Sequence, residues 1–202
     1  MPQVELSGVK QLRKAIRLFA PDLNKELNKE LRKALKPVVT QARGFVPSDS
    51  PISQWQSRSF SSATFPMYNA FTIRAGIGFT TSAGRTTKSG FTSNASIFNS
   101  SPVGAIYETA GRKNPSGQPW VGAKAGGSSR KVSHSTNPNA GKTFISKLPP
   151  LVESNAGAGR LIFRAWANNK GVAYGAALKA IDIATRAFND RAKTSTFSKV
   201  IK

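Results

Sequence analysis

The residues that could carry out chemistry are few in this chain and lie far apart. His134 is the only histidine, and the acids nearest to it in the sequence are Glu108 and Glu153. A catalytic triad needs its histidine beside a carboxylate on a rigid scaffold, whereas His134 lies among the Ser and Gly residues typical of a loop. The nine acidic residues are scattered and do not suggest a metal site. Cysteine is absent from the sequence, which excludes disulfides and thiolate ligands.

Two short motifs approach known phosphate-binding patterns without completing them. The run GKT at 141–143 matches the end of a phosphate-binding loop, but the glycine required five positions earlier is Thr136. Gly157 and Gly159 begin a dinucleotide fingerprint whose third glycine would fall at Ile162. We therefore expect no enzymatic activity, no cofactor and no metal. A cryptic nuclease is the enzyme class that remains, and the scattered acids and single histidine argue against it.

Positive charge is the dominant chemical feature of the chain. Thirty Lys and Arg residues stand against nine Asp and Glu, for a formal net charge of +21. A field of this sign attracts polyanions such as DNA, RNA or an acidic protein surface. Segment 112–147 carries basic residues and no acidic one. Its basic residues and two in a predicted hairpin tip are the candidates for contact with DNA in a channel or with a partner: Arg85, Lys88, Arg112, Lys113, Lys124, Arg130, Lys131, Lys142 and Lys147.

These cations are suited to phosphate groups rather than to bases. Trp120 is the only candidate in segment 112–147 for stacking on a base. No helix-turn-helix or zinc-finger signature occurs in the chain. We therefore expect contacts that do not depend on nucleotide sequence. The basic residues between 22 and 36 alternate with acids, so we expect them to form an ordinary solvated helix face.

The strongest structural pattern predicts an amphipathic helix over residues 21–45. Leucines recur every four residues from Leu23 to Leu35, which places them on one face. Glu26 and Glu30 each precede a lysine by three positions and should pair with it. Pro37 excludes one carbonyl from the helical ladder, so we expect a kink or a break there.

Other patterns predict the remaining elements along the chain. Ser7 is a plausible cap for a helix through about Phe19, and residues 1–6 could be a strand or a loose arm. Strict alternation predicts a strand over 69–81, paired in a hairpin with a second strand over 91–98. A short helix is expected over 103–110, ended by Gly111. Residues 148–158 suit a loop or a helix, 160–166 a strand, and 172–192 a final helix with a stripe of small side chains.

Together these elements predict a single α+β domain over residues 1–202. The long N-terminal amphipathic helix and the C-terminal helix are expected to pack on a small antiparallel sheet. Segments 46–68 and 112–147 are expected to be extended loops or arms within the domain. No apolar run reaches the length of a membrane span, and the first residues lack the apolar core of a signal peptide, so we expect a soluble protein with no membrane partner.

The order of these elements resembles the neck and tail-completion proteins of long-tailed bacteriophages, the head–tail joining and tail-terminator-like family. In that family a β-hairpin is followed by a short helix that ends in a Glu-x-Gly-like motif. The run AIYETAG at 105–111 occupies that place, with two residues rather than one between Glu108 and Gly111. The family closes with an arginine-and-apolar strand and a C-terminal helix, which GRLIFRAW at 159–166 and residues 172–192 resemble.

The resemblance implies a non-enzymatic structural protein of the virion, made in the host cytoplasm. Such proteins form a ring in the neck that completes the tail and joins it to the DNA-filled head. The implied partners are further copies of the chain in a closed ring of six, the neighbouring neck, connector and tail-tube proteins, and DNA that passes without sequence-specific contact. The alternative function is non-specific nucleic-acid binding, which would show affinity for free nucleic acid with a steep dependence on salt.

Overall fold

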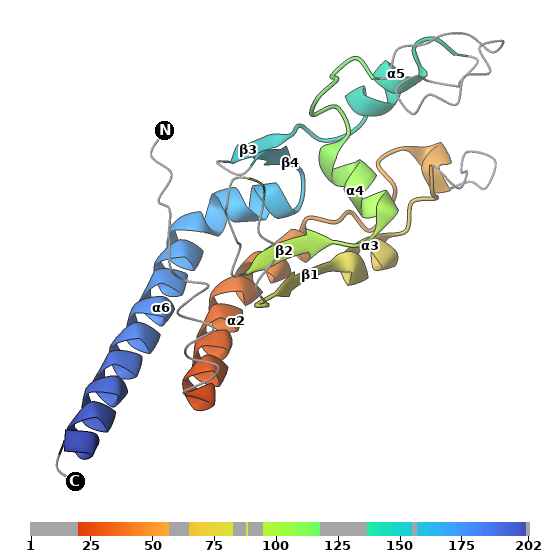
Figure 1. The fold of residues 1–202 in the computed structure, drawn as a ribbon. Coiled ribbons are helices and arrows are strands. Elements are labelled where there is room, and N and C mark those ends of the chain that lie inside the picture. Colours follow the sequence, from red (N-terminus) through yellow and green to blue (C-terminus); the bar gives the residue numbers. More distant parts are fainter. Residues whose placement is uncertain are drawn as a thin grey trace. The chain divides into compact units, whose positions relative to one another are not determined.

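The computed structural model describes residues 20–56, 65–82, 88, 95–117, 137–154 and 157–200, and the side chains of 192 and 194–200 are outside that description. Figure 1 shows the elements in chain order. They are α2 (Pro21–Gly44), the 3-10 helix η1 (Ser53–Gln56), α3 (Ala70–Gly76), β1 (Ile77–Thr80), β2 (Ser96–Asn99), α4 (Pro102–Thr109), α5 (Ala140–Ser146), β3 (Val152–Ser154), β4 (Gly157–Gly159) and α6 (Ile162–Val200). The helix expected over 7–19 and the arm over 1–6 lie outside the described residues.

The fold is α+β, as the sequence predicts. Long helices are combined with two small antiparallel sheets of two strands each, β1 with β2 and β3 with β4. In the second sheet Val152 lies opposite Gly159 and Ser154 opposite Gly157. The strands are short, so most of the buried apolar surface belongs to helices.

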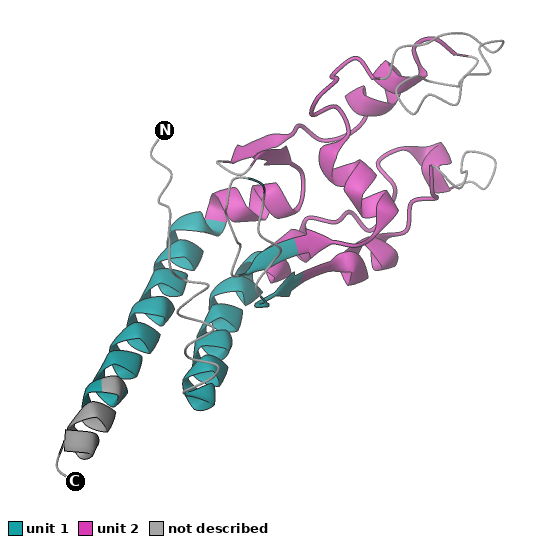
Figure 2. Cartoon of the chain, in the orientation of Figure 1, with its two compact units in different colours: residues 1–38, 79–97, 169–202 teal, residues 39–78, 98–168 magenta. Residues whose placement is uncertain are grey.

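The contacts within the chain gather in two compact units, coloured separately in Figure 2. Unit 1 comprises residues 1–38, 79–97 and 169–202, and unit 2 comprises 39–78 and 98–168. Each unit is assembled from segments that are distant in the sequence. The single domain expected over 1–202 stays a prediction.

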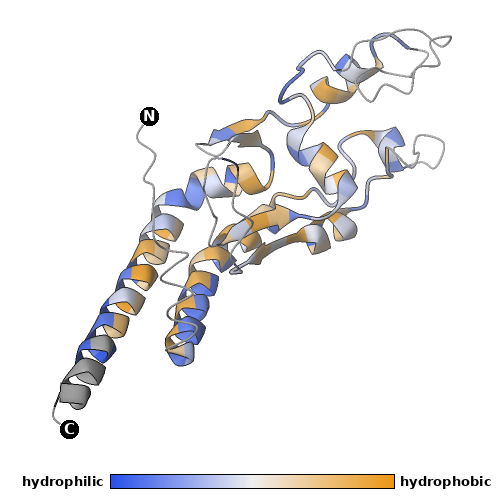
Figure 3. Ribbon diagram, viewed as in Figure 1, coloured by the Kyte–Doolittle hydropathy of each residue, from blue (hydrophilic) through white to orange (hydrophobic). Residues whose placement is uncertain are grey.

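The core of unit 1 forms between α2 and α6. Leu27 and Leu31 of α2 are buried against Ala180 and Ala184 of α6. The alanines are small enough to let the leucine side chains approach the neighbouring helix closely. In Figure 3 α2 carries both hydrophilic and hydrophobic residues along its length, as an amphipathic helix should. The leucine stripe predicted from the sequence is therefore a packing surface.

We expect Leu31→Ala to lower the free energy of unfolding by about 2–5 kcal/mol, because Leu31 is 4% exposed and its truncation leaves a cavity. Leu23 packs only partly against the same cluster, so Leu23→Ala should cost less. Urea denaturation followed by circular dichroism measures both changes. Equal small effects would mean that the stripe is not the core of unit 1.

Of the kink or break expected at Pro37, the break does not occur, because α2 continues through this residue to Gly44, and the kink stays a prediction. Pro37 removes a hydrogen bond from the helical ladder, but its neighbours compensate by burial. Leu35, Val38 and Val39 are buried on either side of it. The predicted pairs on the outer face are present, with 3.6 Å between Lys29 and Glu26 and 2.5 Å between Lys33 and Glu30.

The strand expected over 69–81 is wrong in its first half, which forms α3. Asn69 caps this helix, since its side chain accepts a hydrogen bond from the N–H of Thr72 at 2.9 Å. Ile73 and Ile77 are fully buried, at helical spacing, whereas Phe71 is 79% exposed. Burial thus follows the helical period rather than the alternation in the sequence. Only Ile77–Thr80 is a strand, and it pairs with β2 as the hairpin prediction requires.

The expected helix over 103–110 is confirmed as α4. Ser101 caps it by accepting from the N–H of Gly104 at 3.2 Å, and Pro102 opens it. Gly111 follows with a positive φ of 85°, a conformation that strongly favours glycine.

The segment after residue 148 differs from the prediction in two ways. Residues 152–154 and 157–159 pair as the antiparallel strands β3 and β4 rather than forming a loop or a helix. The predicted strand over 160–166 is wrong, because α6 already begins at Ile162 and runs to Val200. The predicted helix over 172–192 is therefore the middle of a longer one.

Candidate functional site

The structure describes five of the nine predicted contact residues. Arg85, Lys124, Arg130 and Lys131 lie outside the described residues. Lys88 is exposed. The other four, Arg112, Lys113, Lys142 and Lys147, belong to unit 2 and are exposed as well.

Within the described part of unit 2, arginines and lysines differ in what they contact. Every described arginine has an internal partner, and these partners are backbone carbonyls or aromatic rings. Arg112 lies 5.5 Å from the ring centroid of Phe163, and Arg164 lies 4.1 Å from that of Phe45. Arg43 and Arg74 donate to the carbonyls of Ile77 and Val46, and Arg160 donates to three carbonyls.

The described lysines of unit 2 are instead available to a partner. Lys113, Lys142 and Lys147 are exposed, and none forms an ion pair with a described acidic residue. Arg112 is therefore a weaker candidate for contact with an anion than these three lysines, since its charge already lies over Phe163.

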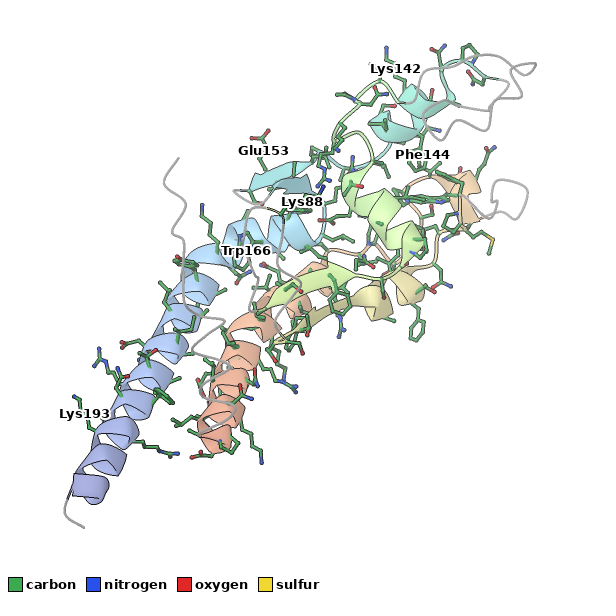
Figure 4. All side chains as sticks on the ribbon, in the orientation of Figure 1. Lys88, Lys142, Phe144, Glu153, Trp166 and Lys193 are labelled. Carbon is green, nitrogen blue, oxygen red and sulfur yellow. The ribbon has the colours of Figure 1, made fainter. Side chains whose placement is uncertain are left out.

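Helix α5 carries Lys142 and is anchored by an aromatic cluster. Trp55 of η1 is fully buried, and its ring centroid lies 4.9 Å from that of Phe144 in α5. Phe65 and Tyr68 lie 5.8 Å and 5.2 Å from Trp55 by the same measure. Lys142 and Phe144, both labelled in Figure 4, thus come from one helix, one side chain exposed and the other in the cluster. The cluster holds the described ends of both predicted arms in place.

Sequence reasoning missed a buried charged junction between α4 and α6, made by Glu108 and Arg160. Glu108 is 4% exposed, and its carboxylate accepts from the N–H of Leu161 at 2.5 Å and of Phe163 at 3.0 Å. Leu161 immediately precedes α6 and Phe163 lies in its first turn, where N–H groups have no partner within the helix. A carboxylate is also favoured there by the helix dipole. Glu108 therefore caps α6 from another helix.

Arg160 completes the α4–α6 junction from the other side. Its guanidinium donates to the carbonyls of Tyr107 at 3.0 Å and Ala110 at 2.9 Å, at the end of α4, and to that of Pro149 at 2.5 Å. A cation at the C-terminal end of a helix satisfies carbonyls that the helix leaves unpaired. Glu108 of α4 thus caps the start of α6, and Arg160, just before α6, caps the end of α4.

Close packing at the α4–α6 junction explains two glycines that the sequence analysis compared with a nucleotide fingerprint. A Cβ at Gly159 would overlap Oε1 of Glu108, so only glycine fits there. Gly157 has a φ of 134°, a conformation that L side chains rarely adopt. Both glycines therefore serve the β3–β4 hairpin and its contact with Glu108.

The α4–α6 junction is suited to holding the chain together rather than to catalysis. Burial raises the pKa of Glu108, and the N–H groups of Phe163 and Leu161 offset part of that rise. Burial likewise lowers the pKa of Arg160. Both charged groups form hydrogen bonds to the backbone. One signal in the sequence points to the α4–α6 junction. Glu108 is the lone charged residue in the run PVGAIYET, whose other residues are mostly apolar or small.

A second feature that sequence reasoning set aside is the outer face of α2 in unit 1. A groove of about 630 Å³ runs along it, lined by Asn28, by Phe79 of β1 and by five cations, Lys25, Lys29, Arg32, Lys33 and Lys36. These five cations, called here the basic face of α2, were expected to be an ordinary solvated surface. The groove places them together beside a half-buried aromatic side chain.

Comparisons with known proteins give no family for this chain. No family model, curated protein or solved structure matches it. Among the described residues, no group of three or more His, Cys, Asp or Glu side chains could hold a metal ion. None of the described helices is long and apolar enough to cross a membrane.

Proposed function

We propose that this chain is a non-enzymatic structural protein of a tailed bacteriophage. In this proposal, copies of it form a closed ring, most simply of six, in the neck of the virion, where the ring completes the tail and joins it to the DNA-filled head. Its partners are the neighbouring neck, connector and tail-tube proteins and the DNA that passes through the ring.

The observation that carries the proposal is the α4–α6 junction. The resemblance to the phage family rests on the order of the predicted elements and on two short segments, AIYETAG at 105–111 and GRLIFRAW at 159–166. The second segment departs from the strand that the resemblance implies, because α6 begins at Ile162. Glu108 of the first segment is hydrogen-bonded to Leu161 and Phe163 of the second, and Arg160 of the second to Tyr107 and Ala110 of the first. The motif residues therefore act together, which supports their use as one family signature.

The charge of the chain supports the same function. A protein around a DNA channel needs a positive field that attracts phosphates without reading bases, since tight base contacts would stall the DNA. The exposed lysines of segment 112–147 suit acidic surfaces on neighbouring proteins. Lys142 is exposed on α5, and this helix is anchored by the contact of its Phe144 with Trp55. The alternative, a protein that binds nucleic acid non-specifically outside a virion, shares the charge but does not require a ring.

Electron microscopy tests the proposed function. Negatively stained purified protein should show rings with a central channel, and antibody against the chain should label the neck of particles of the phage that encodes it. A phage that lacks the protein should accumulate unattached heads and tails. Label on the capsid surface, or complete particles without the protein, would contradict the proposal.

The role of the exposed lysines can be tested separately. We expect Lys142→Gln with Lys147→Gln to leave the fold and the ring intact, because both side chains are exposed, but to reduce the yield of joined, infectious particles. The matched control replaces Lys179 and Lys193, which are exposed on α6, and should leave the yield near that of the wild type. Equal yields from the two double variants would mean that the lysines of segment 112–147 only solvate it.

A further inference from the structure

The basic face of α2 is a continuous row of cations on one side of a helix. Its members follow one another at steps of three, four and one, from Lys25 to Lys36, and so remain on one face. The leucines that pack against α6 occupy the opposite face, which fixes the row outward in unit 1. Phe79 lines the same groove and supplies its apolar wall.

Acidic neighbours neutralise only part of this row. Lys29 and Lys33 are paired with Glu26 and Glu30, at 3.6 Å and 2.5 Å. Lys25, Arg32 and Lys36 are exposed and form no ion pair with a described acid. Salt bridges at an exposed helix surface are weak, so a polyanion can also compete for the two paired lysines.

The length of the row matches a stretch of DNA backbone. Lys25 and Lys36 are 11 residues apart, which corresponds to about 16 Å along a helix that rises ~1.5 Å per residue. One DNA strand carries a phosphate every ~3.4 Å of its axis, so about five phosphates span this distance. The row is thus long enough for several of its cations to contact phosphates of one duplex.

We propose that the basic face of α2 is the surface through which this protein holds the phosphate backbone of duplex DNA. The inference rests on the proposed function, because it names the part of the chain that contacts the passing DNA. Five of the seven side chains that line the groove are cations, which position a backbone but carry little base specificity. Long, flexible lysines suit contacts that must form and break as DNA moves.

Duplex DNA fits this row better than an acidic protein surface does. DNA repeats a phosphate at every nucleotide, so any stretch of duplex as long as the row presents several negative charges to it. The charges of a folded acidic protein have no such repeat. An acidic protein is therefore treated as a competing outcome of the experiment.

Salt-dependent binding of duplex DNA to the full chain tests the inference. A fluorescently labelled 30-base-pair duplex is titrated with protein between about 50 and 200 mM salt, and anisotropy gives the dissociation constant at each concentration. The test variant replaces Lys25, Arg32 and Lys36 by Gln. The matched control replaces Lys113, Lys142 and Lys147 by Gln, which removes the same charge from exposed lysines of unit 2.

We expect the test variant to lower the slope of log affinity against log salt by about 2.7, since each phosphate contact contributes about 0.9. The control should lower it by less than about 1, and a second duplex of different sequence should give the same values as the first. Circular dichroism melts should be unchanged in both variants, because all six residues are exposed.

Other outcomes overturn the inference in distinguishable ways. Equal reductions by the two triple variants would show that only the overall charge matters. Polyglutamate could bind at least as tightly as the duplex at the same salt concentration and lose this binding in the test variant. That result would assign the groove to an acidic protein. Wild-type protein that binds no duplex would also overturn it, while neck labelling in particles would still decide the proposed function independently.

Discussion

Replacing Glu108 by Ala should destabilise the protein by about 2–6 kcal/mol. The side chain is buried, and its removal leaves the N–H groups of Leu161 and Phe163 without an acceptor, at about 1–3 kcal/mol each. Chemical denaturation monitored by circular dichroism measures the loss. The matched control is Glu153→Ala, an exposed carboxylate of β3 in the same unit, which should change stability by less than about 0.5 kcal/mol.

A second substitution at this position tests the electrostatics of the junction. Glu108→Gln keeps one acceptor oxygen but turns an amide toward the other N–H, so it should fall between wild type and Glu108→Ala. Burial raises the pKa of Glu108 in the folded protein, so the folded state holds this proton more tightly than the unfolded state does. The stability difference between wild type and Glu108→Gln should therefore grow as pH falls from above the folded pKa toward the unfolded value near 4.5. A difference that shrinks in acid would show that the carboxylate form stabilises the junction more than burial penalises it.

Replacing Trp55 by Ala should also destabilise the protein strongly, by about 3–5 kcal/mol. Trp55 is fully buried, contacts the rings of Phe65, Tyr68 and Phe144, and donates from Nε1 to the carbonyl of Pro66 at 2.9 Å. Thermal melts followed by circular dichroism measure the effect. Hydrogen exchange should show faster opening of α5, since Phe144 loses its contact with Trp55 and keeps only that with Phe65 among the ring contacts described.

Two companion variants make the Trp55 result specific. Trp55→Phe keeps an aromatic ring but loses the hydrogen bond, and should cost less than Trp55→Ala. Phe71→Ala removes an aromatic side chain that is 79% exposed in the same unit, and should have little effect. Unchanged exchange in α5 after Trp55→Ala would mean that the aromatic cluster does not hold this helix.

Both large predictions concern contacts between residues that are distant in the sequence, which is where prediction from sequence was weakest. Glu108 and Leu161 are separated by 53 positions, and Trp55 and Phe144 by 89. No local pattern indicates that a carboxylate from one helix will cap another. The cap that starts α6 comes from Glu108, outside segment 160–166. The sequence of this segment alone therefore suited a strand.

Local patterns did determine several elements of this protein. The leucine repeat of α2, the lysine–glutamate pairs at three-residue spacing and the Ser101–Pro102 start of α4 all appear as predicted. Each depends on interactions between residues within one or two helical turns, and those interactions are encoded in the local order of residues. The α+β class was predicted from the helical stripes together with the alternation over 71–79, of which residues 77–79 are in a strand.

Only the tertiary structure decided which charges are available and where the short elements end. The alternation over 71–79 suited a strand, but the Asn69 cap and the burial of Ile73 and Ile77 favour a helix there. The basic residues of the sequence look alike, yet packing places the arginines of unit 2 on carbonyls and rings and leaves its lysines exposed, within the part of the chain that is described. It also gathers five cations of α2 beside Phe79. Composition fixes the total charge of a protein, but burial and hydrogen bonding between distant segments determine which part of it can meet a partner.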